Sequence, residues 1–142
     1  EVILTAPFHL SKALIPELLA ANGGCIINIT FIYGEFGPDW GLYEGTSMGN
    51  PAAYGASKGG LMQLTRWLAT TLAPNIRVNA LSPGGVLRNQ PREFVENYSQ
   101  KTPMARMANE DDFRGSIAYL ASDLSRYVTG HTLRVDGGIT TW

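Results

Sequence analysis

A tyrosine and a lysine lie four positions apart in the segment PAAYGASKGG, residues 51–60. If this segment is helical, Tyr54 and Lys58 lie on one face of the helix, about one turn apart. A free tyrosine has a pKa near ~10, and a lysine ammonium a few ångströms away lowers that pKa by favouring the phenolate. Such a pair can pass a proton to or from an alcohol or carbonyl oxygen. The same spacing also occurs on ordinary helix surfaces, so the pair alone leaves both interpretations open.

The composition indicates one globular domain with a sizeable core. The chain has 142 residues, of which 44% are hydrophobic and 16% are charged, and this composition is not that of a disordered protein. The formal net charge is -1, and the arginines are scattered singly rather than gathered in a stripe. We therefore expect no nucleic-acid partner.

Cysteine usage and hydropathy predict a cytoplasmic protein without a membrane segment. The one cysteine, Cys25, lies in an apolar run and cannot form an internal disulfide, which is typical of a reducing compartment. No apolar stretch approaches the ~20 residues that a membrane-spanning helix needs, and no signal peptide is visible at the N-terminus. His9 and His131 have no Cys, His or carboxylate at ligand spacing, so we expect no metal site.

Hydrophobic periodicity and turn residues predict alternating helices and strands. The pattern favours helices over 2–21, 51–73, 91–99 and 110–121, and strands over 25–30, 77–82 and 131–136. Strands that alternate with helices are typical of a parallel sheet covered by helices. The segment 31–50 is predicted to be a long loop rich in glycine and aromatic residues, and a loop of this length in a compact domain is usually functional or disordered. Its aromatic residues favour the functional interpretation.

Four motifs in a fixed order resemble the C-terminal half of the short-chain dehydrogenase/reductase family. They are GGCIINIT at 23–30, YGASK at 54–58, IRVNALSPGG at 76–85, and the closing segment at 106–138. The resemblance covers nearly the whole chain and implies an α/β fold, a partial Rossmann-like parallel sheet with flanking helices that forms the C-terminal half of a doubly wound fold. It also implies NAD or NADP as cofactor and a small-molecule substrate. Within the family, the segment 37–60 is similar to members associated with bacterial surface-sugar or flagellin modification.

The resemblance also implies roles for individual residues. Tyr54 would be the general acid and base of the reaction. Lys58 would bind the hydroxyls of the nicotinamide ribose and lower the pKa of Tyr54. Pro83, Gly84 and the backbone of Val86 would line the nicotinamide, and Tyr54 and Lys58 would complete the cofactor site.

Two positions depart from the family pattern where polar side chains are expected. Phe31 occupies the position of the family's catalytic serine, and a phenyl ring cannot hydrogen-bond a substrate oxygen. Thr30 is a weak surrogate, because adjacent strand residues point to opposite faces and only a bulge or register shift would bring its hydroxyl round. Ile3 occupies the position of the family's asparagine.

Phe31→Ser should raise turnover by ~10²–10³ if the family mechanism applies, and no gain would mean that the substrate is positioned in some other way.

The sequence contains no glycine-rich phosphate loop after a strand, although a dinucleotide-binding fold needs one to hold the pyrophosphate. We therefore interpret residues 1–142 as a single, truncated domain without the N-terminal dinucleotide-binding half, and expect neither cofactor binding nor turnover by this chain alone.

Three strands without the rest of the sheet leave an apolar edge open, and open edges pair with other chains. We expect a homo-oligomer formed through the helices 2–21 and 51–73, which often form the subunit interface in the family.

Three hypotheses about function remain open at this point. In the first, the chain is part of an NAD(P)-dependent oxidoreductase that transfers a hydride to or from a hydroxyl carbon, with a sugar derivative as one form of substrate. In the second, it is a catalytically impaired or truncated relative that persists as an oligomeric fold unit. In the third, it is a sugar- or nucleotide-binding module. The substrate-contacting residues expected from the loop are Tyr33, Phe36, Trp40 and Tyr43.

Overall fold

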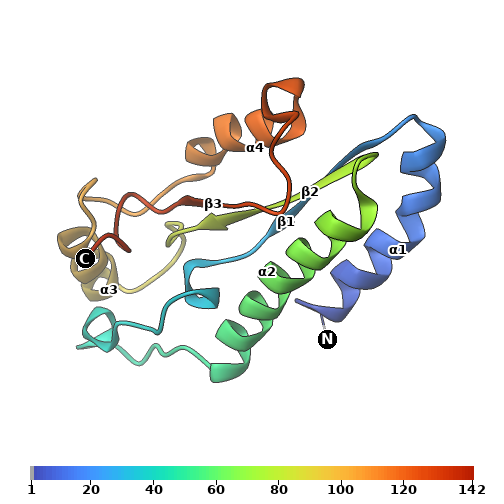
Figure 1. Cartoon of the computed structure of the whole chain (residues 1–142). Coiled ribbons are helices and arrows are strands. Elements are labelled where there is room, and N and C mark those ends of the chain that lie inside the picture. Colours follow the sequence, from blue (N-terminus) through green and yellow to red (C-terminus); the bar gives the residue numbers. More distant parts are fainter. Residues whose placement is uncertain (1) are drawn as a thin grey trace.

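The computed structural model describes residues 2–142 as three strands and four helices (Figure 1). The helices are α1 (Thr5–Ala20), α2 (Ala52–Leu72), α3 (Arg92–Lys101) and α4 (Arg114–Ala121). The strands are β1 (Gly24–Ile29), β2 (Ile76–Pro83) and β3 (Thr132–Val135). Four short 3₁₀ turns, Ile32–Gly34, Trp40–Tyr43, Glu110–Phe113 and Asp123–Ser125, lie in the connections.

The three strands form one parallel sheet in the order β1-β2-β3. The register runs from Gly24 opposite Ile76 to Ile29 opposite Leu81, and from Ala80 opposite Thr132 to Pro83 opposite Val135. β2 lies in the middle and is buried along most of its length, because strands pair with both of its edges and helices pack against it. The predicted parallel α/β architecture is therefore confirmed.

Helices cover both faces of the sheet (Figure 1). α1 and α2 lie along one face, and α4 lies against the other face. A cluster centred on Leu68, Ile76 and Val78 joins α2 to β2, and α1 packs against it. On the same face, the buried amide of Asn28 donates a hydrogen bond of 2.9 Å to the hydroxyl of Thr65, which fixes β1 against α2.

Several element boundaries differ from the sequence-based prediction. The helix expected at 110–121 is a 3₁₀ turn, Glu110–Phe113, followed by α4, because Asn109 and Asp112 form a capping box that holds the turn apart from the helix. The helix expected from residue 2 begins at Thr5. The predicted loop at 31–50 contains two 3₁₀ turns, and the first of them packs closely against α2.

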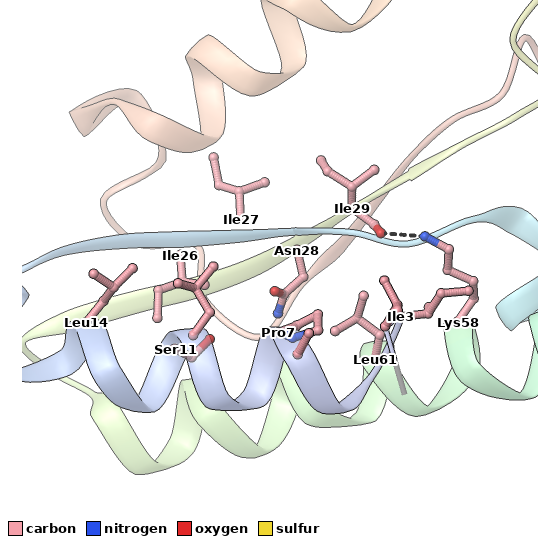
Figure 2. Close-up of a pocket in the computed structure, with 13 residues that line it drawn as sticks. Ile3, Pro7, Ser11, Leu14, Ile26, Ile27, Asn28, Ile29, Lys58 and Leu61 are labelled. Atoms are coloured by element: carbon pink, nitrogen blue, oxygen red, sulfur yellow. Dashed lines mark hydrogen bonds between the residues drawn. The ribbon is translucent and has the colours of Figure 1, made fainter.

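The outer edge of β1 is open within residues 2–142, because β1 pairs only with β2 there. A groove of about 730 Å³ runs between this strand and α1, and its walls are largely apolar (Figure 2). Ile29 at the end of the strand is 48% exposed. The open apolar edge expected from the sequence is therefore present. In the same residues, no helix combines the length and hydropathy needed to cross a membrane.

Candidate active site

α2 brings Tyr54 and Lys58 together on one face, as their spacing predicts. The ammonium nitrogen of Lys58 lies 5.7 Å from the centroid of the Tyr54 ring. The same nitrogen donates a hydrogen bond of 2.9 Å to the carbonyl of Ile29, at the end of β1 (Figure 2). Both side chains are half-buried. Lys58 therefore links the tyrosine helix to the carboxyl end of the neighbouring strand, where ligands bind in open α/β sheets.

Glycines allow the 3₁₀ turn at Ile32–Gly34 to approach α2 backbone to backbone. A Cβ on Gly34 would lie 2.8 Å from the backbone nitrogen of Gly59, and one on Gly59 would lie 3.0 Å from the carbonyl oxygen of Gly34. A Cβ on Gly55 would lie 2.8 Å from the carbonyl oxygen of Tyr33. Because distances under 3.0 Å are essentially absent for real Cβ atoms, larger residues would push the turn away from the helix. This contact sets how far the aromatic rings of the turn lie from Tyr54.

Phe31 packs directly on Tyr54. The ring centroids are 5.6 Å apart in an edge-to-face arrangement, and the other edge-to-face partner of Phe31 is Tyr33, at 5.1 Å. Both arrangements are favourable for aromatic pairs. The position of the family's serine is thus an apolar wall beside Tyr54.

The structure does not support Thr30 as a surrogate for that serine. Thr30 is 1% exposed, and its hydroxyl donates a hydrogen bond of 3.0 Å to the carbonyl of Leu81. The one hydrogen of the hydroxyl is used in that bond. The pairing of β1 with β2 is also regular from Gly24 to Ile29, without the bulge that a surrogate role would need. Ile3 lies beside Lys58 at one end of the groove of β1 and offers no hydrogen-bonding group (Figure 2).

Two further tyrosines form a hydroxyl pair at the same place. The hydroxyl of Tyr43 donates a hydrogen bond of 3.1 Å to the hydroxyl of Tyr33. The Tyr43 ring lies between Trp40 and Phe94, at centroid distances of 5.6 and 5.3 Å. Burial, and then the hydrogen bond from Tyr43, raises the pKa of Tyr33, so that this hydroxyl keeps its proton.

The electrostatics of Tyr54 correct one expectation. Lys58 was expected to lower the pKa of Tyr54, but burial raises that pKa, and the nearby Tyr43 adds to the effect. Burial also lowers the pKa of Lys58. The ammonium of Lys58 hydrogen-bonds the Ile29 carbonyl and not the phenol, and burial is the larger of the two causes that raise the pKa of Tyr54. Tyr54 is therefore a neutral phenol at pH 7, ready to donate a proton.

A cavity of about 360 Å³ opens beside these side chains, and its lining residues all lie between residues 29 and 107. The residues expected from the sequence that line it are Thr30, Phe31, Tyr33, Tyr43, Tyr54, Lys58, Pro83, Gly84 and Val86. Among the residues that the structure describes, Lys58 is the only charged one in its wall. The cavity is thus lined by aromatic faces, a few hydroxyls and one cation.

Two residues expected to contact substrate do not line this cavity. Phe36 lies under the guanidinium of Arg134, whose central carbon is 5.3 Å from the ring centroid. Trp40 is 59% exposed and packs on the outer side of Tyr43. The sequence predicts substrate contact for all four aromatic residues, because they lie in one loop. It contains no signal that distinguishes Phe36 and Trp40 from Tyr33 and Tyr43.

The cavity wall also contains residues to which the sequence assigned no role. They are Ile29, Met48, Gly85, Gln90, Phe94, Tyr98 and Met107. Phe94 and Tyr98 face the cavity from α3, four residues apart, and the hydroxyl of Tyr98 accepts a hydrogen bond from the backbone N–H of Gly85. Their spacing of one helical turn was a usable signal, since it marks the buried face of a helix.

The residues present fit the nicotinamide end of the implied cofactor. The strand end at Pro83 and Gly84 lies in the cavity wall with Tyr54 and Lys58. A Cβ on Gly84 would lie 2.9 Å from the Cα of Asp136 and 2.9 Å from the Tyr98 hydroxyl, so this position needs a glycine. Within residues 2–142, the Lys58 ammonium makes one hydrogen bond and keeps two N–H groups for a ligand such as ribose hydroxyls. The same residues contain no grouping of three or more metal-ligating side chains.

The known proteins that this chain resembles include dehydrogenases solved with NAD+ and with NADP. The family model described as Enoyl-(Acyl carrier protein) reductase matches residues 1–140. A post-translational flagellin modification protein A from Campylobacter coli is 42% identical over 116 residues, which are 81% of this chain and 45% of that protein. A short chain dehydrogenase from Leptospira borgpetersenii with bound NAD+ superposes with a TM-score of 0.90 and 40% identity, covering 98% of this chain and 54% of that one. A gluconate 5-dehydrogenase from Burkholderia cenocepacia in complex with NADP and tartrate superposes with a TM-score of 0.86 and 29% identity. The match covers 99% of this chain and 54% of that one. The chain thus spans about half the length of the proteins it matches.

Proposed function

The chain belongs to the short-chain dehydrogenase/reductase family, and from this premise we propose that the full-length protein is an NAD(P)-dependent oxidoreductase acting on a hydroxyl or carbonyl carbon. The observation that carries the proposal is the shared cavity of Tyr54, Lys58, Pro83 and Gly84 at the carboxyl ends of β1 and β2. Solved relatives with NAD+ and with NADP support the cofactor class. When bound, the nicotinamide supplies or accepts the hydride.

In this mechanism Tyr54 is the proton donor to the carbonyl oxygen in reduction. A neutral phenol beside the substrate gives its proton as negative charge develops on the oxygen, and takes it back in oxidation. Lys58 holds the ribose end of the ligand through its two remaining N–H groups and keeps one bond to Ile29. Its positive charge also stabilises the phenolate once the proton has left Tyr54.

The raised pKa of Tyr54 gives a pH dependence with a definite sign. Reduction needs protonated Tyr54, so kcat for reduction should stay level through neutral pH and fall only above about pH 10. Oxidation needs the phenolate, so kcat for oxidation should rise with pH across the same range without reaching a plateau below about pH 10. Steady-state profiles in both directions check this. A plateau for oxidation near neutral pH would show that Lys58 dominates over burial.

We further propose a neutral, polyhydroxylated substrate such as a sugar derivative. The cavity offers aromatic faces from Phe31 and Phe94 and neutral polar groups from Tyr33, Tyr43 and Gln90. Such a lining suits a ring or chain that has C–H faces and hydroxyls, and gives an anionic group little besides Lys58 to pair with. A D-arabinitol 2-dehydrogenase from Candida tropicalis, 40% identical to this chain, supports the same class, because arabinitol is a neutral polyol.

An absorbance assay tests the proposed function. Full-length protein is incubated with NAD+ or NADP+ and a panel of polyols, sugar acids and hydroxysteroids, and the formation of reduced nicotinamide is followed. We expect at least one neutral polyol to support reduction of the coenzyme faster than the sugar acids do. The same panel with the Tyr54→Phe variant gives the background rate. Equal rates with both proteins would contradict the proposal.

We also propose that α1 and α2 form an interface between copies of this chain. Phe8 and Leu19 on α1 are 37% and 45% exposed, Trp67 on α2 is 54% exposed, and these three residues do not line the groove of β1. Apolar residues of this size gathered on two neighbouring helices favour association. Multi-angle light scattering on the 142-residue chain should give a mass of at least twice 15.4 kDa, and the double variant Phe8→Lys with Trp67→Lys should lower this mass. A monodisperse 15.4 kDa species would contradict this proposal.

A further inference from the structure

The proposed reaction needs a second hydrogen-bond donor beside Tyr54 to hold the substrate oxygen. A single donor of this kind contributes ~10²–10³ in rate where charge develops in the transition state. Phe31 has no donor, and the hydroxyl of Thr30 is bound to the carbonyl of Leu81. Neither side chain of the segment 30–31 therefore performs this task.

The hydroxyl pair of Tyr33 and Tyr43 has one hydrogen to spare. Two hydroxyls joined by one hydrogen bond use one of their two hydrogens, whichever way that bond runs. In the structure Tyr43 donates to Tyr33 at 3.1 Å, and within residues 2–142 the Tyr33 hydroxyl donates to no other group. Both tyrosines line the cavity that Tyr54 and Lys58 share.

Packing holds this pair in place before any ligand arrives. The ring of Tyr33 stands edge-on to Phe31, and the ring of Phe31 stands edge-on to Tyr54, so the three rings form one wall. The backbone of Tyr33 rests on Gly55 of α2, and the Tyr43 ring is held by Phe94 of α3. A donor fixed in this way needs little reorganisation during reaction.

We propose that the Tyr33–Tyr43 hydroxyl pair donates to the substrate oxygen the hydrogen bond that Phe31 cannot give, with Tyr33 as the group in contact. The inference rests on the proposed function and assigns a substrate-binding residue within the same site. Tyr43 acts through Tyr33 as a positioning residue. The strongly raised pKa of Tyr33 agrees with this role, because the hydroxyl stays protonated wherever the enzyme works.

A set of variants of the full-length protein tests this inference. Tyr33→Phe keeps the ring and removes the hydroxyl, and should lower kcat by ~10²–10³ while the affinity for NADH, measured by fluorescence, stays within about twofold. Tyr43→Phe should lower kcat by a smaller factor. Phe31→Ser removes the ring that packs on Tyr33 and Tyr54, so it should give no gain in kcat by itself. Added to Tyr33→Phe, it should restore much of the loss, since it supplies another donor. Tyr127→Phe removes a fully exposed hydroxyl and is the matched control.

The outcomes separate this inference from the proposed function. If the wild type shows turnover that depends on Tyr54, and Tyr33→Phe retains it within about threefold, the inference fails and the function stands. A large gain from Phe31→Ser in the wild-type background would also overturn it, because it would show that no donor is in place. If thermal unfolding shows that Tyr33→Phe does not fold, the loss of kcat in Tyr43→Phe and the absence of a gain in Phe31→Ser decide. No turnover in the wild type overturns the function and the inference together.

Discussion

Replacing Tyr54 by phenylalanine should lower kcat of the full-length protein by roughly 10²–10⁴-fold, the range of general acid–base catalysis by one side chain. The substitution removes one hydroxyl and keeps the ring that packs edge-on against Phe31. The fold and the affinity for NADH should therefore be unchanged, because the Lys58 ammonium and its bond to Ile29 stay in place. Initial rates of reduced-nicotinamide formation measure the effect, with NADH fluorescence as the binding measurement.

Ser57 provides a matched control for this variant on the same helix. Its hydroxyl donates a hydrogen bond of 2.6 Å to the carbonyl of Ala53, four residues earlier, and does not line the cavity. Ser57→Ala also removes one hydroxyl from α2 and should leave kcat within about twofold, as is usual away from reacting atoms. Equal losses in Tyr54→Phe and Ser57→Ala would mean that α2 is merely sensitive to substitution, and would contradict an acid–base role for Tyr54.

Gly34→Val should lower the free energy of unfolding by ~1–3 kcal/mol, the usual cost of overpacking. It should also lower kcat. A Cβ at this position meets backbone on α2, 2.8 Å from both the nitrogen of Gly59 and the carbonyl carbon of Lys58. Backbone cannot rotate away as a side chain can, so the turn carrying Tyr33 must move off the helix carrying Tyr54. Denaturant unfolding gives the change in stability, and kcat gives the effect on the site.

Gly37 is the matched control in the same loop, because nothing lies within 4 Å of a Cβ placed there. Gly37→Ala should leave both the free energy of unfolding and kcat close to the wild-type values. If Gly34→Val unfolds at the same denaturant concentration as the wild type, the close approach of the turn to α2 is not what positions the site.

The fold could be predicted from the sequence where local patterns decide it. The apolar stripe of α2, with Leu61, Thr65 and Leu68 buried, follows the helical period. The three strands follow from short apolar runs bounded by turn residues, and their alternation with helices predicts the parallel sheet. Boundaries were less accurate at 110–113, where side-chain capping by Asn109 and Asp112 decides the conformation.

The site could be predicted only where a motif carries it. Tyr54 and Lys58 lie together as their spacing requires, whereas the hydrogen bond of the Thr30 hydroxyl to the Leu81 carbonyl is visible only in the structure. The Tyr33–Tyr43 bond could not be foreseen, because it depends on backbone contact between a turn and a helix. The direction of the pKa shift of Tyr54 could not be foreseen either, since it depends on how deeply α3 and the loop bury the phenol.

Deuterium transfer tests the central claim most directly. Full-length protein is given a ketose and reduced coenzyme that carries two deuterium atoms on C4 of the nicotinamide, and the alcohol formed is analysed by mass spectrometry. Hydride transfer to a carbonyl carbon, with the proton supplied through Tyr54, predicts one deuterium on the carbon that bears the new hydroxyl, and product only with an intact Tyr54. Product without deuterium, or equal labelling by Tyr54→Phe at the wild-type rate, would contradict it.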